Sequence, residues 1–334
     1  MLVDKTIKKI LKEKNNYGKS NYGKNKKVVI ESPGPNTNKP LHLGHLRNMA
    51  LGISISNLLK EIGYKVINVD IVNDRGIHIC KSMLAYKKFA KNKMPNKKSD
   101  HFVGDYYVMF SQQAKDNPEL EEEAKEILLK WENKDKEVIS LWKKMNNWTI
   151  KGIKETYKTF GVKIDKTYFE SQYYEKGKDI ILKFYKKGLF KKNKLGAIVA
   201  DLTKDNLGEK VLLREDGTSI YITQDLHLAI QRYEDYKMDK MIYIVGSEQI
   251  YHFRVLFKLL KLMNYKFVNN YYHLPYGMIY LPEGKMKSRE GKVVDADNLI
   301  KDVNILAKKE IIIRDQTLTR EELDLVNIVV YHVH

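Results

Sequence analysis

The sequence predicts an α/β fold built around a doubly wound parallel sheet. In residues 28–72 an apolar run, a loop and an amphipathic segment precede a second apolar run, the order of strand, crossover helix and parallel strand. The same alternation returns in residues 211–263, whereas residues 91–195 lack it and favour helices. A chain of 334 residues is long enough for two or three such units with sizeable cores.

The first crossover unit is the clearest. Residues 28–30 are an apolar strand that leads into a proline-rich loop, and residues 43–62 carry apolar side chains on one helical stripe. Gly63 ends this helix, and residues 65–72 have the composition of a buried strand. Asn73-Asp-Arg-Gly76 follows that strand, where open α/β sheets bind ligands. An ordinary strand-to-helix turn explains these four residues equally well.

We expect five segments along the chain. They are a polar, lysine-rich lead-in (1–26), the first half of the nucleotide fold (27–90), a connective insertion (91–195), the second half (196–275), and a lysine-rich loop with a helical extension (276–334). Within the insertion we expect helices at 118–131 and 134–160. In the second half we expect strands at 211–213, 218–222, 241–245 and 277–281, with helices after Asp225, over 250–263 and from 297 onward.

The composition indicates what kind of binding partner and which cellular compartment to expect. Sixty Lys plus Arg against 42 Asp plus Glu leave a net charge of +18, which favours a polyanionic partner. The abundance of Lys, Asn, Ile and Tyr also fits an AT-rich coding bias, which explains much of the lysine equally well. Cys80 is the single cysteine, so no intramolecular disulfide can form. Because no long apolar span or secretory signal is visible, we expect a cytoplasmic protein without a membrane segment.

His42-Leu-Gly-His45 stands where the first loop meets the first long helix. The first turn of a helix has free N–H groups and the positive end of the helix dipole, so imidazoles there can donate hydrogen bonds to phosphate. Gly44 leaves room for a nucleotide against the backbone. The two histidines have a second explanation, as helix caps or partly buried polar residues.

A second basic signature, Lys285-Met-Lys-Ser-Arg289, lies far downstream between glycines. In this order the pair resembles the HIGH and KMSKS signatures of class I aminoacyl-tRNA synthetases. The flanking residues, including Asn73-Asp-Arg-Gly-Ile-His78, resemble arginyl-tRNA synthetases of bacterial type. The resemblance covers residues 17–315 and implies a Rossmann-like catalytic domain of the HUP type, with the insertion near the tRNA acceptor end.

The resemblance assigns the ATP site to both signatures. It implies ATP contacts at His42, Gly44, His45, Lys285, Met286, Lys287, Ser288 and Arg289. The second signature departs from the common form, since Ser288 occupies the usual place of its second lysine. Many arginyl enzymes instead carry a lysine ahead of the first histidine, and Lys39 stands there. The implied catalytic set is therefore His42, His45, Lys285 and Lys39, although Lys39 also fits a plain surface lysine.

The implied amino-acid pocket must accept a guanidinium and an ammonium group, so it needs carboxylate and carbonyl acceptors. The family's arginine contacts match Glu31, Asn36, Tyr221, Asp225 and Gln249 in type and spacing. Each is an ordinary polar residue by itself. Together they follow expected strand ends, as a shared pocket requires.

The resemblance implies an arginine–tRNA ligase that uses ATP, Mg²⁺ bound with ATP, L-arginine and tRNA(Arg), with no dedicated protein metal site. Family members usually carry a leading domain and a helical anticodon-binding domain. The sequence ends at His334 within an expected helix. We therefore expect a natural catalytic core, half of a split enzyme whose anticodon-binding domain a separate protein supplies, or a truncated product.

Two other functions share parts of this sequence pattern. A nucleotidylyltransferase would use the same histidine signature with another acceptor, but would not need the five arginine contacts. A non-catalytic paralogue that binds tRNA or arginine would not need His42, His45 and Lys285.

Overall fold

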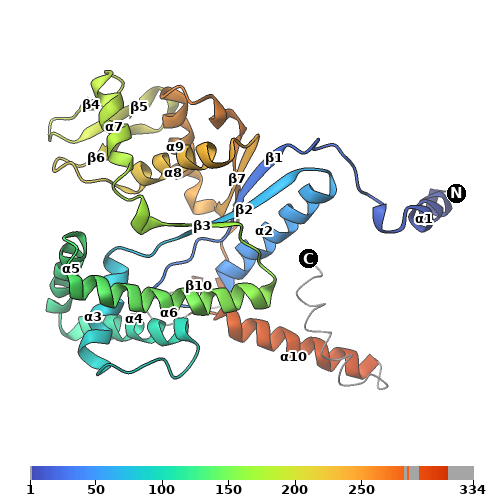
Figure 1. The fold of residues 1–334 in the computed structure, drawn as a ribbon, viewed down its shortest axis with the longest axis horizontal. Coiled ribbons are helices and arrows are strands. Elements are labelled where there is room, and N and C mark those ends of the chain that lie inside the picture. Colours follow the sequence, from blue (N-terminus) through green and yellow to red (C-terminus); the bar gives the residue numbers. More distant parts are fainter. Residues whose placement is uncertain (1, 282–283, 286–292, 315–334) are drawn as a thin grey trace.

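The computed structural model describes residues 2–281, 284–285 and 293–314. Its centre is a five-stranded sheet in the order β3-β2-β1-β7-β8, in which every neighbouring pair is parallel (Figure 1). The strands are β1 (Lys27–Glu31), β2 (Lys65–Val72), β3 (Lys166–Phe169), β7 (Lys240–Gly246) and β8 (Tyr271–Tyr276). The doubly wound parallel α/β fold predicted from the sequence is therefore confirmed.

The chain reverses its direction of travel across the sheet between β1 and β7. From β1 it crosses through α2 (Leu43–Glu61) to β2 and later to β3, and it then returns to β7 on the other side of β1. Helix α9 (Ile250–Leu262) connects β7 to β8. Such a reversal leaves a crevice at the carboxyl ends of the two central strands, where ligands bind in open α/β sheets.

Helix α2 packs unusually closely on the end of β1 because Gly52 has no side chain. A Cβ at Gly52 would lie 2.5 Å from the Ser32 hydroxyl. That hydroxyl donates to the Asn48 side chain, and the Asn48 amide donates to the Ile244 carbonyl at 2.6 Å. Three segments, the loop after β1, α2 and β7, are thus joined directly beneath the crevice.

A helical unit follows β2. It consists of α3 (Ile77–Phe89), α4 (Ser99–Asp116), α5 (Glu119–Glu132) and α6 (Lys136–Phe160), which pack around an apolar core of their own at the lower left of Figure 1. The helices expected at 118–131 and 134–160 are present. The tryptophans lie in or against packed side chains, as Trp131 is buried and Trp148 packs on the unit's core. Strand β3 also falls inside the range 91–195 and joins the main sheet.

A small antiparallel sheet lies beside the main one and begins before residue 196, the expected start of the second half. It contains β4 (Lys191–Lys192), β5 (Ile198–Leu202) and β6 (Gly208–Leu213), with α7 (Gly177–Lys186) and α8 (Tyr221–Tyr236) nearby (Figure 1). The strand predicted at 218–222 is wrong, because only Ser219 bridges to Leu213 and α8 already begins at Tyr221. The β-branched residues there form the approach to a helix, which their short-range pattern does not distinguish from a strand.

The strand predicted at 277–281 is also misplaced. The sheet strand is β8, which ends at Tyr276. Residues 277–279 belong to no strand, and a hairpin then pairs β9 (Tyr280–Leu281) with β10 (Gly284–Lys285). Within the described residues, the 3-10 helices are η1 (Lys14–Asn16), η2 (Glu170–Gln172), η3 (Thr203–Asp205), η4 (Ser247–Gln249) and η5 (Lys266–Asn270).

The first and the last helix of the described residues project from the body (Figure 1). Helix α1 (Leu2–Glu13) stands clear of the remaining helices in Figure 1, and α10 (Ala296–Arg314) begins against α2 and α6. Among the described residues, no helix combines the length and the apolar character needed to cross a membrane.

Candidate active site

A cleft of about 1540 Å³ opens at the carboxyl edge of the central sheet. Its lining comes from the residues that follow β1, β2, β3, β7 and β8, together with the start of α2 and of α8. The predicted site residues that line it are Glu31, Asn36, His42, Gly44, His45, Tyr221, Asp225 and Gln249. The tertiary structure therefore gathers in one cleft side chains that are up to 218 residues apart, the span from 31 to 249.

His42 and His45 cap α2 reciprocally. The Gly44 N–H donates to His42 Nδ1 at 3.1 Å, and the His42 N–H donates to His45 Nδ1 at 3.1 Å. The ring centroids are 4.0 Å apart. Because both Nδ1 atoms accept hydrogen bonds, each neutral ring carries its proton on Nε2. The capping role and a role in the cleft are thus compatible, since each Nε2–H remains a donor.

Both imidazoles are held neutral. Burial and the nearby charge of Lys39 lower the pKa of His42 to about 4. Burial and the neighbouring His42 lower the pKa of His45 well below its usual range. Lys39 is not among the residues that line the cleft, but its charge contributes to lowering the pKa of both histidines.

The downstream signature, residues 285–289, lies between two segments that are close to the cleft and to the start of α2. Met278 and Ile279 line the cleft, and on the far side the Leu43 N–H donates to the Val294 carbonyl at 2.9 Å. Lys285 lies in β10 of the intervening hairpin. The predicted ATP contacts Met286, Lys287, Ser288 and Arg289 lie outside the described residues.

Glu31 is neutralised by a residue of the chain itself. Its carboxylate forms an ion pair with Arg232 of α8, whose side chain is 1% exposed and which also lines the cleft. Burial raises the pKa of Glu31, and the guanidinium opposes that shift. The guanidinium lies 5.0 Å from the Tyr168 ring centroid and 5.7 Å from that of Tyr243. The floor of the cleft therefore carries a compensated charge pair.

Asp225 is the second predicted carboxylate. It lies in the first turns of α8, and its Oδ2 is 2.6 Å from Nε2 of His252 on α9. Its side chain is 32% exposed, in contrast to the buried Glu31. Tyr221 is exposed at the start of the same helix, and Gln249 ends η4 after β7. A partly exposed carboxylate that lines one cleft with a phenol and an amide can accept hydrogen bonds from a cationic ligand.

Sequence reasoning missed three residues of this cleft. Arg232 and His252 lie in helices, one or two turns beyond the matched positions, and no local signal marks them. Glu170 follows β3, a strand that we did not predict, and it lines the cleft with its pKa raised to about 7 by burial. A polar residue directly after a short strand is the signal that could have identified it.

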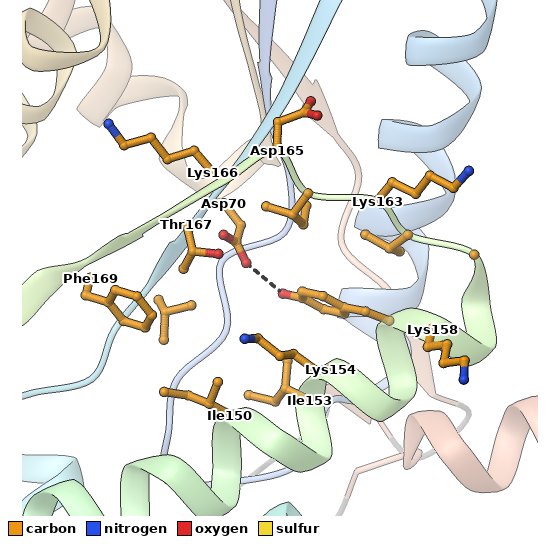
Figure 2. A pocket seen from close by; sticks show the side chains of 15 residues that line it. Asp70, Ile150, Ile153, Lys154, Lys158, Lys163, Asp165, Lys166, Thr167 and Phe169 are labelled. Atoms are coloured by element: carbon orange, nitrogen blue, oxygen red, sulfur yellow. Dashed lines mark hydrogen bonds between the residues drawn. The ribbon is translucent and has the colours of Figure 1, made fainter. Parts of the chain in front are cut away.

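A second cavity, of about 470 Å³, lies between α6 and β3 (Figure 2). The Tyr157 hydroxyl donates to buried Asp70 there at 3.2 Å, and Lys154, Lys158 and Lys163 stand around it. This cavity shares no lining residue with the cleft and contains none of the predicted site residues.

Comparison with known proteins gives a consistent set of relatives. Residues 6–332 match the family model described as tRNA synthetases class I (R), catalytic domain. The chain is 56% identical over 283 residues to an arginine–tRNA ligase of Treponema denticola, covering 83% of this chain and 48% of that protein. It is 47% identical over 287 residues to the arginine–tRNA ligase of Borreliella afzelii, covering 83% of this chain and 49% of that protein.

Solved structures share the fold at much lower identity. The arginyl-tRNA synthetase of Thermus thermophilus superposes with a TM-score of 0.78 at 20% identity, over 92% of this chain and 57% of that one. The arginyl-tRNA synthetase of Plasmodium falciparum superposes with a TM-score of 0.72 at 22% identity, over 93% of this chain and 51% of that one. The chain thus spans about half the length of the curated relatives that it matches.

Proposed function

We propose, from the premise that this chain belongs to the family of class I arginyl-tRNA synthetase catalytic domains, that it catalyses the ATP-dependent attachment of L-arginine to tRNA(Arg). The observation that carries the proposal is the cleft, in which the start of α2 with its two histidines and the carboxylates of Glu31 and Asp225 line one volume. We place the reaction in the cytoplasm.

The reaction has two steps, and both transfer an acyl or phosphoryl group without a covalent enzyme intermediate. A carboxylate oxygen of arginine attacks the α-phosphorus of ATP, and pyrophosphate leaves. A ribose hydroxyl at the 3′ end of tRNA then attacks the carbonyl carbon of the adenylate, and AMP leaves. Both steps depend on positioning and on stabilising charge at phosphate oxygens.

His42 and His45 supply donors for this charge. Their Nδ1 atoms are engaged in capping, so their Nε2–H groups are oriented before ATP binds. Neutral donors stabilise charge that develops in the transition state without holding the product pyrophosphate as tightly as a cation would. Mg²⁺ would enter with ATP and neutralise its phosphates, and we propose no dedicated protein ligands for it. Lys285, Lys287 and Arg289 would complete the site. They belong to the loop that carries the second signature, residues 285–289, which we call the signature loop.

Arginine would bind on the side of Asp225. Because Arg232 already compensates the buried Glu31, the partly exposed Asp225 is the better placed of these two carboxylates to pair with a ligand cation. We propose that Asp225 and Tyr221 receive the guanidinium, while Asn36, Gln249 and the polar edge of Glu31 complete the pocket. A shorter or neutral amino acid would leave acceptors of this pocket unpaired, at a cost of about 1–3 kcal/mol per group, which favours arginine.

The experiment is ATP–pyrophosphate exchange with the purified chain. We expect exchange that requires L-arginine, is unsupported by lysine or citrulline, and increases when tRNA(Arg) is added. Absence of arginine-dependent exchange at any tRNA concentration, in a correctly folded sample, would refute the proposal. Binding of tRNA or arginine without exchange would instead identify a non-catalytic paralogue. Exchange that requires an acceptor other than arginine would identify a nucleotidylyltransferase.

A further inference from the structure

The segment that returns from the signature loop is bonded to the histidine signature. The Leu43 N–H donates to the Val294 carbonyl at 2.9 Å, and the Ala296 N–H donates to the Leu41 carbonyl at 3.1 Å. His42 and Asp295 form an antiparallel bridge between these two bonds. The position of this return segment therefore fixes one end of the loop that carries Lys285 relative to the imidazoles.

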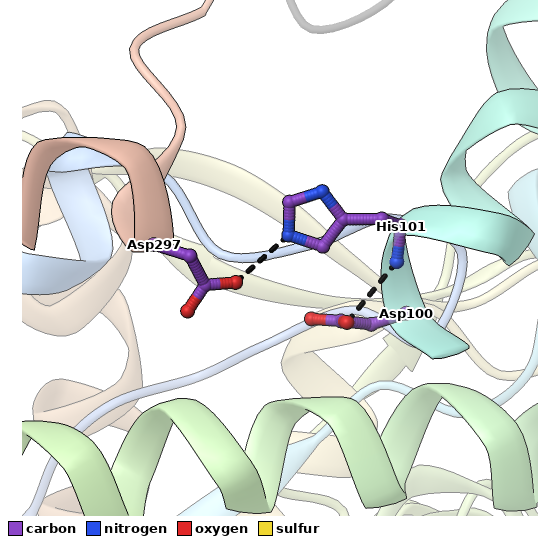
Figure 3. Close-up of side chains that lie close together, drawn as sticks. All are labelled: Asp100, His101 and Asp297. Carbon is purple, nitrogen blue, oxygen red and sulfur yellow. Dashed lines mark hydrogen bonds and ion pairs between the residues drawn. The ribbon is translucent and has the colours of Figure 1, made fainter. Parts of the chain in front are cut away.

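The return segment ends in a dense polar cluster at the start of α10. Asp297 receives hydrogen bonds from His101 Nε2 at 2.8 Å, Lys98 Nζ at 2.7 Å and the Thr156 hydroxyl at 2.8 Å. Figure 3 shows His101 of α4 reaching across to Asp297, with Asp100 beside it. The first turn of α10 is thus held by two helices of the insertion, α4 and α6.

This cluster does not have the form of a metal site. The ligand atoms of Asp100, His101 and Asp297 lie within 4.8 Å of one another, a spacing that could suit a cation. However, Lys98 Nζ lies 3.0 Å from the Asp100 carboxylate and 2.7 Å from that of Asp297. An ammonium group of the chain therefore already occupies the cation position between the two carboxylates.

The surrounding packing is built around the same cluster. Asp100 is fully buried, and a Cβ on Gly152 of α6 would lie 2.2 Å from its Oδ1. One turn further along α4, a Cβ on Gly104 would lie 2.6 Å from Pro40, just ahead of His42. The start of α4 therefore contacts both the approach to the histidine signature and the return from the signature loop.

We propose that Lys98, His101 and Asp297 form a latch through which the insertion holds the return of the signature loop against the histidine signature in the geometry that ATP requires. The three are positioning residues, since none lines the cleft. The inference rests on the proposed function for its kinetic consequence, but its structural part does not.

The first test measures backbone protection by hydrogen exchange in the intact chain without substrates. In Asp297→Asn and Lys98→Met, we expect the amides of Leu43 and Ala296 to exchange about 5- to 10-fold faster than in the wild type, because their partners lose the latch. Lys166→Met is the control, since it removes a lysine of β3 whose Nζ is 2.6 Å from Asp235 of α8, outside the latch. This control variant should leave the exchange rates of the Leu43 and Ala296 amides unchanged.

The second test separates positioning from general destabilisation. In pyrophosphate exchange, Asp297→Asn should raise the KM for ATP about 5- to 10-fold while leaving the KM for arginine within about twofold of the wild-type value. His101→Gln keeps a side-chain donor, and its KM for ATP should lie between the values of the wild type and of Asp297→Asn. If Asp297→Asn proves poorly folded, the His101→Gln and Lys98→Met variants supply the same comparison.

The outcomes distinguish this inference from the proposed function. Unchanged protection of Leu43 and Ala296 in well-folded variants would overturn the latch, whatever the activity. Equal increases in the KM for ATP and for arginine would also overturn it, because they indicate a general loss of structure. A wild-type chain without exchange would refute the proposed function, while the protection measurement would still decide the latch.

Discussion

At the scale of single residues, His42 and His45 cap a helix and, in the proposed function, also donate hydrogen bonds to ATP. Their Nδ1 atoms cap α2, and the same bonds fix the tautomer that presents Nε2–H to the cleft. The two roles can be separated by substitution, because asparagine retains both an acceptor and a donor whereas alanine has neither.

His45→Ala should reduce the rate of pyrophosphate exchange by about 100-fold, the typical effect of removing one preorganised donor from a transition state. The lost cap should lower the free energy of unfolding by only about 1 kcal/mol. His45→Asn is the control, and it should recover most of the stability and part of the rate. A loss of activity that simply follows the unfolded fraction, measured by urea denaturation, would contradict this division.

Asp225→Asn should raise the KM for arginine by about 10- to 100-fold, because a charge-assisted hydrogen bond to the guanidinium is lost. The KM for ATP should stay near the wild-type value. His252→Gln leaves the carboxylate in place and should have a smaller effect on arginine. If the dependence on arginine is the same in Asp225→Asn and the wild type, the pocket lies elsewhere in the cleft.

At the scale of elements, the site depends on how closely α2 approaches the loop after β1. The Ser32 hydroxyl occupies the space that a Cβ at Gly52 would need, and its bond to Asn48 limits its movement. Helix propensity and packing therefore oppose each other at this position.

Gly52→Ala should lower the free energy of unfolding by about 1–3 kcal/mol, since overpacking at 2.5 Å outweighs the gain in helix propensity. Asn57→Ala, at an exposed position of the same helix, should change stability by less than about 0.5 kcal/mol. Thermal and urea denaturation would measure both. A stabilised Gly52→Ala protein would show that α2 can shift away from Ser32 without cost.

At the scale of the whole molecule, the pair Glu31 and Arg232 joins the first strand of the fold to a helix of its second half. Both side chains are buried beneath the cleft. Breaking such a pair leaves an uncompensated charge in the interior, whereas removing both charges costs much less.

Arg232→Met should lower the free energy of unfolding by about 3–5 kcal/mol, because Glu31 loses its partner. The double variant Glu31→Gln with Arg232→Met should recover a large part of that loss. Lys166→Met, which breaks an exposed pair, is the control and should change stability by less than about 1 kcal/mol. Additive losses in the double variant would show that the two side chains do not interact energetically.

The sequence by itself determined the parallel α/β architecture, the first crossover unit and the start of α2 at Leu43, because periodicity, glycine stops and capping act within a few residues. It also indicated the cleft residues Glu31, Asn36, Tyr221, Asp225 and Gln249 through resemblance. Only the tertiary structure decided that β3 joins the sheet, that α8 begins at Tyr221, and that Arg232 compensates Glu31. These features depend on contacts between residues far apart in the chain, and local patterns carry no record of such contacts.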